Sequence, residues 1–252
     1  MESNSDLSKK AVISKTPVTL IGAGRSSRSD LEKALEFAPT LVAADGGARY
    51  AIKANKELKA VIGDFDSLSR KLQQSLSPEQ IFRVDEQDTT DFEKALSLIS
   101  APLVVALGFM WPRIDHQLAS FHSLITQCQQ PCILVGSKQV AFLCPPIVEL
   151  TGPAGRLISL FPIMPTIIKS KGLHWELNGV RLSAGGMVGT SNYAVTETVR
   201  IETDTPGLLV ILNRADADMA RDALLKLKQC WSGFVVNDST HLLVNRKGSS
   251  TV

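Results

Sequence analysis

The chain has 252 residues, of which 44% are hydrophobic and 21% are charged, a composition typical of a globular protein. Its formal net charge is +2 and it has no Lys/Arg-rich block, which excludes a typical nucleic-acid binder. Its length accommodates one large domain or a main domain with a smaller partner.

Three further features bear on location. No apolar run approaches the roughly 20 residues that a membrane-spanning helix needs, so we expect no membrane partner. Residues 1–17 are polar, lack the apolar core of a signal peptide and are expected to form a flexible N-terminus. The four cysteines form no CxxC pair, which argues against a zinc ribbon or a secreted disulfide framework. A cytoplasmic protein with reduced cysteines is therefore predicted.

Short apolar segments alternate with helical patterns over residues 18–144. Segments of this kind, apolar on both faces and rich in Val, Ile and Leu, are typical of buried parallel strands. The first helix is predicted to begin at Ser29, with Glu32 completing a capping box, and further helices follow Asp91 and Arg113. The alternation predicts an α/β domain with a doubly wound, mostly parallel sheet. Its predicted strands are Val18–Gly22, Thr40–Ala44, Ala60–Gly63, Ile81–Val84, Leu103–Leu107 and Cys132–Val135.

The pattern changes near Pro145, where Pro and Gly become frequent. Residues 145–212 are predicted to form a smaller, antiparallel all-β domain, because short β-prone segments replace the alternation. Its predicted strands are Arg156–Phe161, Thr166–Lys169, Tyr193–Ile201 and Leu208–Leu212. Residues 213–252 form a C-terminal extension without an assigned role. It contains a helical pattern over Ala215–Gln229 and two short apolar segments, Phe234–Val236 and Leu242–Val244.

Aspartates follow the predicted strands of the first domain. They are Asp45, Asp64, Asp66, Asp88 and Asp91. An open α/β sheet brings the carboxyl ends of its strands to one edge, where ligands bind. Carboxylates gathered there repel one another unless a hard divalent cation joins them, and the remaining positions of such a cation suit phosphate oxygens. The pattern therefore favours a metal–polyphosphate site.

Each motif also has a plain structural reading. The two carboxylates of Asp64-Phe65-Asp66 point the same way if the segment is extended, but a solvated strand-end turn explains them as well. Asp45-Gly46-Gly47 suits either a phosphate-facing turn or a strand turn with Asp as a helix cap. Asp88 is either a metal ligand or the N-cap of the following helix, with Asp91 three residues on.

Taken together, the motifs closely resemble those of the thiamine pyrophosphokinase family. The resemblance extends from about Val18 to Leu212. It is carried by Asp45-Gly46-Gly47-Ala48, Ile62-Gly63-Asp64-Phe65-Asp66-Ser67, Gln87-Asp88-Thr89-Thr90-Asp91-Phe92-Glu93-Lys94-Ala95-Leu96, Arg113-Ile114-Asp115-His116, Gly172-Leu173-His174-Trp175 and Gly189-Thr190-Ser191-Asn192. Each motif is modest alone, but the six in this order are specific. The segment Phe109–Pro112 departs from the family, which usually has glycines there.

The resemblance implies transfer of a pyrophosphoryl group from ATP to the hydroxyl of thiamine, giving thiamine diphosphate and AMP. It implies Mg²⁺ held by Asp45, Asp64, Asp66 and Asp91, with Asp88 as a further ligand or only a helix cap. Asp91 is the preferred acceptor of the alcohol proton, and Arg113 would contact phosphate. The resemblance also implies an α/β nucleotide domain followed by an all-β sandwich domain. It further implies a homodimer with thiamine at the subunit interface.

The same resemblance assigns residues to thiamine. Trp175 would stack on its rings, and Ser191 and Asn192 would bind the aminopyrimidine, with Gln87 and Thr190 as further candidates. Asp115 would either orient Arg113 or contact the cationic thiazolium. Two alternatives stay open: a pyrophosphokinase for another hydroxymethyl heterocycle such as a pterin, and a non-catalytic thiamine- or nucleotide-binding protein.

Overall fold

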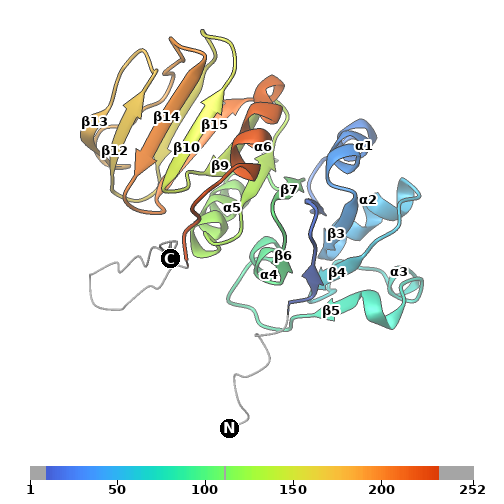
Figure 1. Cartoon of the computed structure of the whole chain (residues 1–252). Coiled ribbons are helices and arrows are strands. Elements are labelled where there is room, and N and C mark those ends of the chain that lie inside the picture. The colour runs from blue at the N-terminus through green and yellow to red at the C-terminus, as the bar shows by residue number, and fades with distance from the viewer. Residues whose placement is uncertain (1–9, 111, 233–252) are drawn as a thin grey trace, which may run out of the picture. The chain divides into compact units, whose positions relative to one another are not determined.

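The computed structural model of the chain describes residues 10–110 and 112–232 (Figure 1). Tertiary contacts divide the chain into two compact units, residues 1–120 and 121–252, and the division falls inside helix α5 (Ile114–Thr126). The limits expected for the two domains, 18–144 and 145–212, stay a prediction. Among the described residues, no helix has the length and apolar character needed to cross a bilayer.

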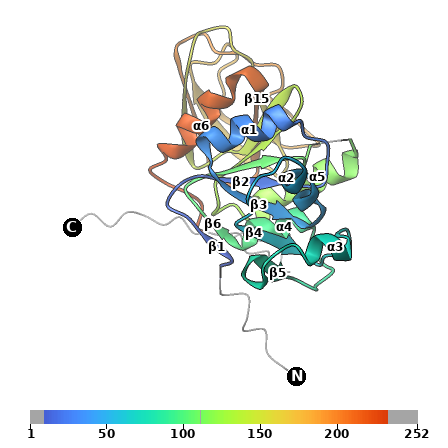
Figure 2. The same ribbon diagram turned by 90° about the vertical axis from the view of Figure 1, so that its right-hand side faces the viewer.

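A parallel sheet forms the centre of the first unit. Its strands are β2 (Val18–Ile21), β3 (Thr40–Ala44), β4 (Ala60–Gly63), β5 (Ile81–Arg83) and β7 (Val104–Leu107). β7 pairs with β2. β2 lies beside β3, and β3, β4 and β5 pair in that order, as Figure 2 shows. Every residue of β2 and β4 is buried, as expected where helices cover a sheet. The predicted α/β class is thereby confirmed.

Short helices connect these strands. They are α1 (Arg28–Phe37), α2 (Ala48–Lys53), α3 (Arg70–Gln73), α4 (Asp91–Ser97) and the 3₁₀ turns η1 (Asp45–Gly47) and η2 (Pro78–Gln80). α2 packs on β2 and β3, and α4 packs on β3 and β4. A small parallel pair, β1 (Val12–Ile13) with β6 (Ile99–Ser100), lies partly within the segment expected to be flexible. The turn η1 directly follows β3, so it begins at the carboxyl end of a sheet strand.

One predicted helix start is wrong, and one of the two roles left open for Asp88 is excluded. The N-cap of α1 is Ser27, not Ser29: its hydroxyl accepts a hydrogen bond from the Asp30 amide, and the Asp30 carboxylate accepts one from the Ser27 amide. The same Ser-x-x-acid pattern occurs two residues earlier than predicted, with Asp in place of Glu. Asp88 does not cap α4, because Thr90 accepts the hydrogen bond from the Glu93 amide.

The second unit contains two antiparallel sheets, which confirms the prediction of a β-rich second domain. One has the order β11-β15-β9-β8 and the other β10-β14-β12-β13 (Figure 1). The strands are β8 (Cys132–Val135), β9 (Gln139–Leu143), β10 (Ile147–Thr151), β11 (Ile158–Pro162), β12 (Thr166–Lys171), β13 (Asn178–Leu182), β14 (Thr198–Thr203) and β15 (Leu208–Asn213). The strand predicted over Tyr193–Ile201 begins only at Thr198, since Tyr193 and Ala194 make isolated bridges to other segments.

The segment after β15 packs on this unit. A 3₁₀ turn, η3 (Arg214–Asp216), leads into α6 (Ala217–Leu225), which packs on β10 and ends four residues before the predicted limit. Trp231 is buried, and its indole Nε1 donates a hydrogen bond of 2.9 Å to the carbonyl oxygen of Cys144. Residues 213–232 of the predicted extension are therefore part of the packed second unit. The predicted segments Phe234–Val236 and Leu242–Val244 lie outside the described residues.

Candidate functional site

Three aspartates converge in the first unit. Carboxylate oxygens of Asp45, Asp64 and Asp91 all lie within 4.8 Å of one another. Asp45 follows β3, Asp64 follows β4 and Asp91 begins α4. The parallel strands thus place their carboxyl ends at one edge, as the sequence predicts, and the start of α4 adds the third carboxylate. An all-oxygen donor set of this kind suits a hard cation such as Mg²⁺.

Asp45 is the most buried member, with 1% of its surface exposed. Its Oδ2 accepts a hydrogen bond of 3.2 Å from the amide of Ser67, whereas its buried Oδ1 has no hydrogen-bond partner. A buried carboxylate oxygen without a partner is costly, because the charge has lost water and gained nothing in return. A cation bound among the three aspartates would satisfy this atom, so the residues present fit such an ion.

Glycines allow the backbone around the turn η1 (Asp45–Gly47) to pack closely against its neighbours. A Cβ at Gly47 would lie 2.0 Å from the carbonyl oxygen of Ile21, and a Cβ at Gly63 would lie 2.8 Å from the Cβ of Asp45. Asp45 itself has a φ of 35°, in the left-handed region that non-glycine residues seldom adopt. Strain at a buried acid held by tightly packed neighbours is typical of a functional site.

The loop after β4 does not have the extended form that would align the carboxylates of Asp64-Phe65-Asp66. Phe65 is buried with a φ of 69°, so the chain turns there. Asp64 Oδ1 accepts a hydrogen bond of 3.2 Å from the Asp66 amide within this turn. The side-chain amide of Gln73 donates to the carbonyl oxygens of Phe65 and Leu68, which fixes the loop in this turned form.

Neighbouring groups shift the pKa values of Asp91 and Asp64 in opposite directions. Burial, followed by the nearby charges of Asp45 and Asp64, raises the pKa of Asp91 to about 6. Burial alone would raise the pKa of Asp64, but hydrogen bonds from the Asp66 amide and from Lys94 outweigh it and lower that pKa. Near neutral pH the site therefore contains a firmly ionised Asp64 beside an Asp91 that protonates in mild acid.

Sequence reasoning missed one residue of this site, Lys94. It is 4% exposed, and its Nζ lies 3.3 Å from Asp64 Oδ2. It stands on α4 between the buried residues Phe92 and Ala95. The signal in the sequence was a lysine among the apolar positions of this helix, three residues after Asp91, which places both on one helix face.

The other predicted ligands lie outside the group of three. Asp66 is exposed, although its charge contributes to the raised pKa of Asp91. Asp88 is exposed, and its amide donates to the carboxylate of Glu86. Gln87 is exposed as well. Glu86 also accepts from the Thr89 amide, and these bonds shape the approach to α4.

Arg113 and Asp115 form an exposed ion pair. Arg113 Nε lies 3.1 Å from Asp115 Oδ1, and Arg113 Nη2 donates to Asp115 Oδ2. The hydrogen bond from Arg113 lowers the pKa of Asp115 to about 2. Of the two roles expected for Asp115, this geometry favours orienting Arg113. The segment Phe109–Pro112 is the one that departs from the family pattern. In it, Phe109 packs on Phe92 with ring centroids 4.4 Å apart, and Trp111 lies outside the described residues.

Of the predicted thiamine residues in the second unit, Asn192 contacts Trp175, which is 56% exposed. His174 stacks on Tyr193 at 4.5 Å, and the Trp175 ring meets both edge-on, at 4.7 and 5.8 Å between centroids. Sequence reasoning did not identify Tyr193. An exposed indole held by two other rings can offer a flat face to an aromatic or cationic ligand.

Asn192 holds this aromatic group in place. It is 2% exposed; its Oδ1 accepts from the amides of Trp175 (3.1 Å) and Tyr193 (2.9 Å), and its Nδ2 donates to the Trp175 carbonyl (2.8 Å). Both lone pairs of the amide oxygen are thus occupied. Its neighbour Ser191 is exposed with a φ of 61°, and Thr190 is exposed too. The geometry gives Asn192 a supporting position and leaves Ser191 and Thr190 open to a ligand.

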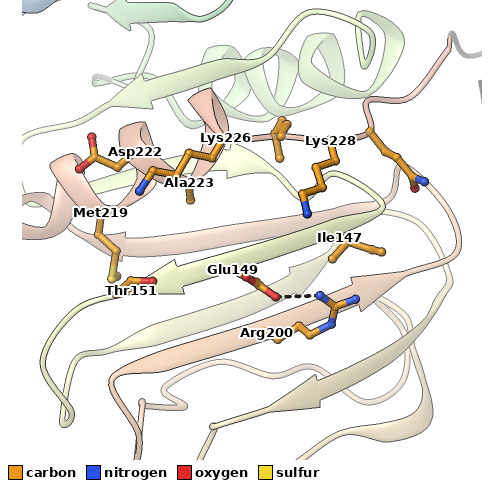
Figure 3. Close-up of a pocket in the computed structure, with 11 residues that line it drawn as sticks. Ile147, Glu149, Thr151, Arg200, Met219, Asp222, Ala223, Lys226 and Lys228 are labelled. Carbon is orange, nitrogen blue, oxygen red and sulfur yellow. Dashed lines mark hydrogen bonds and ion pairs between the residues drawn. The ribbon is translucent and has the colours of Figure 1, made fainter. Parts of the chain in front are cut away.

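A separate cavity of about 590 Å³ lies in the second unit, between α6 and the strands β10 and β14 (Figure 3). Glu149 and Arg200 form an ion pair on its strand side, and Met219 and Asp222 face it from α6. None of the predicted site residues lines it. The cavity therefore belongs neither to the acidic cluster nor to the aromatic group around Trp175.

The fold and the acidic cluster define a two-part protein of the kind that handles polyphosphates: an α/β unit with carboxylates at the carboxyl edge of its sheet, followed by a β-rich unit. Two family profiles match the chain in the same order. "Thiamin pyrophosphokinase, catalytic domain" matches residues 10–135, and "Thiamin pyrophosphokinase, vitamin B1 binding domain" matches residues 147–208. The chain belongs to the thiamine pyrophosphokinase family.

Individual relatives agree with this assignment. The chain is 28% identical over 212 residues to thiamine pyrophosphokinase 1 of Oryza sativa subsp. japonica, and the match covers 67% of this chain and 80% of the relative. It is 25% identical over 187 residues to thiamin pyrophosphokinase 1 of Caenorhabditis elegans, and this match covers 65% of this chain and 75% of the relative. Its fold matches the crystal structure of thiamin pyrophosphokinase from Geobacillus thermodenitrificans with a TM-score of 0.65 and 22% identity, covering 81% of this chain and 99% of that one. The Candida albicans enzyme gives a TM-score of 0.66 at 16% identity, covering 84% and 95%.

Proposed function

We propose that this protein transfers the pyrophosphoryl group of ATP to the hydroxyl of thiamine, yielding thiamine diphosphate and AMP. The observation that carries the proposal is the buried, unpartnered oxygen of Asp45 within a group of three carboxylates, in a chain of the thiamine pyrophosphokinase family. A protein that only bound thiamine would have no use for such a group, because the repulsion among the carboxylates costs stability without metal and polyphosphate.

Asp45, Asp64 and Asp91 are the residues that we propose hold Mg²⁺, and Asp66, whose charge acts on Asp91, is proposed as a further ligand. Asp88 is kept as an outer ligand. A bound Mg²⁺ would neutralise phosphate oxygens and thereby lower the repulsion that ATP presents to an attacking alcohol. Asp91, which begins α4 within the cluster, accepts the alcohol proton in this proposal.

Arg113 is proposed to contact the phosphates through the part of its guanidinium fork that Asp115 leaves open. The ion pair with Asp115 directs that fork, and so Asp115 acts on the nucleotide through Arg113. Because charge neutralisation and alignment contribute most to phosphoryl-type transfers, a misdirected guanidinium should slow turnover even with the metal in place.

Trp175 is proposed to stack on the thiamine rings. Its exposed face, supported by His174 and Tyr193, suits both a flat aminopyrimidine and a cationic thiazolium. Ser191 and Thr190 are proposed to bind the aminopyrimidine, with Gln87 as a further contact and Asn192 acting mainly through Trp175. These residues, together with the family, favour thiamine over a pterin or another heterocycle.

Assembly and location complete the proposal. We propose a homodimer with thiamine bound at the subunit interface, working in the cytoplasm. In this arrangement the thiamine-binding unit of one subunit would serve the phosphate site of its partner. Mixing two variants that are inactivated in different units tests this arrangement.

The metal and catalytic parts are tested by measuring turnover against Mg²⁺ concentration in the wild type, in Asp45→Asn and in Asp218→Asn. Asp218 is an exposed acid on α6, far in sequence from the cluster, and serves as the matched control. The proposal expects the turnover of Asp45→Asn to fall by at least about a hundredfold, because a ligand of the proposed Mg²⁺ is removed. Equal rates in Asp45→Asn and Asp218→Asn would contradict it.

A further inference from the structure

A buried lysine lies directly against the acidic cluster. The side chain of Lys94 is 2% exposed and that of Asp64 is 17% exposed, with 3.3 Å between Nζ and Oδ2. Among the described residues, Lys94 is the one cation with a hydrogen bond or ion pair to any of the three clustered carboxylates. An ammonium carries three donors and is rarely buried unless it is paired, so a position this deep calls for an explanation.

The electrostatics of the cluster supply one. Three carboxylates and one ammonium leave a formal charge of −2, which a single divalent cation cancels. Lys94 contacts Asp64 directly, and carboxylate oxygens of Asp45, Asp64 and Asp91 lie within 4.8 Å of one another, so its charge lies close to the whole cluster. Another nearby cation, Arg83, cannot replace it, because Arg83 is exposed and paired with Asp85.

We propose that Lys94 is the built-in counter-charge of the acidic cluster: its ammonium offsets part of the repulsion among the carboxylates and sets the charge of the site to match one divalent cation. Lys94 thus acts through the carboxylates and is not a catalytic residue. The proposal rests on the proposed role of the cluster as a metal site. It adds that the cluster is assembled before the metal arrives, because a fixed cation already offsets part of the carboxylate repulsion.

Removing the Lys94 ammonium should lower the stability of the metal-free protein and raise its affinity for a divalent cation. Without the ammonium, the carboxylates repel one another more strongly, so the metal-free protein should unfold at a lower urea concentration. The site charge then becomes −3, so the first divalent cation should bind more tightly, with a Kd lower by about tenfold or more. A lysine that served only to pack α4 would lower stability but would leave the Kd unchanged.

The test uses the full chain and needs no turnover. Binding of Mn²⁺ alone is followed by electron paramagnetic resonance and of Mg²⁺ alone by calorimetry, in the wild type, Lys94→Met and Lys94→Arg. We expect Lys94→Met to bind Mn²⁺ at least about tenfold more tightly and to be destabilised in EDTA, whereas Lys94→Arg, which keeps the charge, stays within about threefold of the wild type. An unchanged or weaker Kd in Lys94→Met, with a wild type that binds, would overturn the counter-charge.

A second variant covers poor folding of Lys94→Met. Asp64→Asn combined with Lys94→Met removes both partners and returns the charge of the cluster to −2. This double variant should be more stable in EDTA than Lys94→Met alone, and equal or lower stability would also overturn the inference. If the wild type itself binds neither Mn²⁺ nor Mg²⁺, with or without ATP, the proposed metal site fails instead, so the two failures are distinguishable.

Discussion

Replacing Asp91 by asparagine should stabilise the metal-free protein while abolishing its turnover. The folded protein raises the pKa of this carboxyl from 3.8 to about 6, a change of about two pKa units. Each unit corresponds to about 1.4 kcal/mol, so the ionised form of Asp91 lowers the free energy of unfolding by about 3 kcal/mol at pH 8. Asparagine cannot ionise, and the variant escapes this loss.

The size of this stability difference between the variant and the wild type depends on pH. Because the folded state holds a proton that the unfolded state has released between about pH 4 and pH 6, the wild type loses stability relative to Asp91→Asn as the pH rises through that range. The advantage of the variant should be near zero at pH 4, about 1.5 kcal/mol at pH 5 and about 3 kcal/mol at pH 8.

Urea unfolding in EDTA at several pH values measures this directly. Asp64→Asn is the matched comparison and should be destabilised, because the folded protein lowers the pKa of Asp64 and the change leaves Lys94 buried without its carboxylate. A stability difference between wild type and Asp91→Asn that does not vary with pH, or a variant less stable than wild type at pH 8, would refute the electrostatic reasoning.

Four further outcomes are expected. Trp175→Ala should raise the KM for thiamine at least about tenfold with a smaller effect on kcat, and Trp175→Phe should recover part of the loss; an unchanged KM in steady-state assays would mean that the indole does not stack on thiamine. Asn192→Ala should produce the same KM defect and a stability loss of about 1–3 kcal/mol, since it leaves backbone groups of Trp175 without partners; normal thiamine affinity despite measured destabilisation would argue against a supporting role. At a thiamine concentration well below the raised KM, a mixture of Asp64→Asn and Trp175→Ala should be more active than the sum of the two variants if the site is shared between subunits, whereas no gain after verified subunit exchange would speak against it. Binding of Mg²⁺ by calorimetry should weaken as the pH falls through about 6, because Asp91 must lose its proton to ligate; affinity that stays flat from about pH 7.5 to about pH 5 would remove Asp91 from the metal site.

The strands of the first unit were predictable because burial on both faces leaves a plain signal. Segments such as Val18–Gly22 and Ala60–Gly63 have few residues that suit anything except a covered sheet, and β2 and β4 occupy them. Helix starts were less predictable, because Ser27 and Ser29 both offer a capping hydroxyl. Only the position of the helix on the sheet decides between two such residues.

The strands of the second unit carry a weaker signal. β13 (Asn178–Leu182) is mostly exposed, so its sequence shows little of the apolar pattern that marks a strand. Pairing with β12 makes it a strand, and pairing is a long-range property that local sequence does not contain.

The candidate site shows the same division. The order of strand and aspartate predicts that Asp45, Asp64 and Asp91 meet, because parallel strands share a carboxyl edge. The turn at Phe65 was not predictable, since nothing in Asp64-Phe65-Asp66 marks a positive φ. The role of Lys94 depends on which face of α4 meets the sheet, and that of Asn192 depends on a loop that folds back on Trp175.

The most direct test of the proposed reaction is the release of AMP by the purified protein with ATP and Mg²⁺, with and without thiamine, alongside mass detection of thiamine diphosphate. We expect AMP to form only when thiamine is present and to match thiamine diphosphate one to one. Release of ADP, or no AMP from a folded protein that still binds thiamine, would contradict pyrophosphoryl transfer.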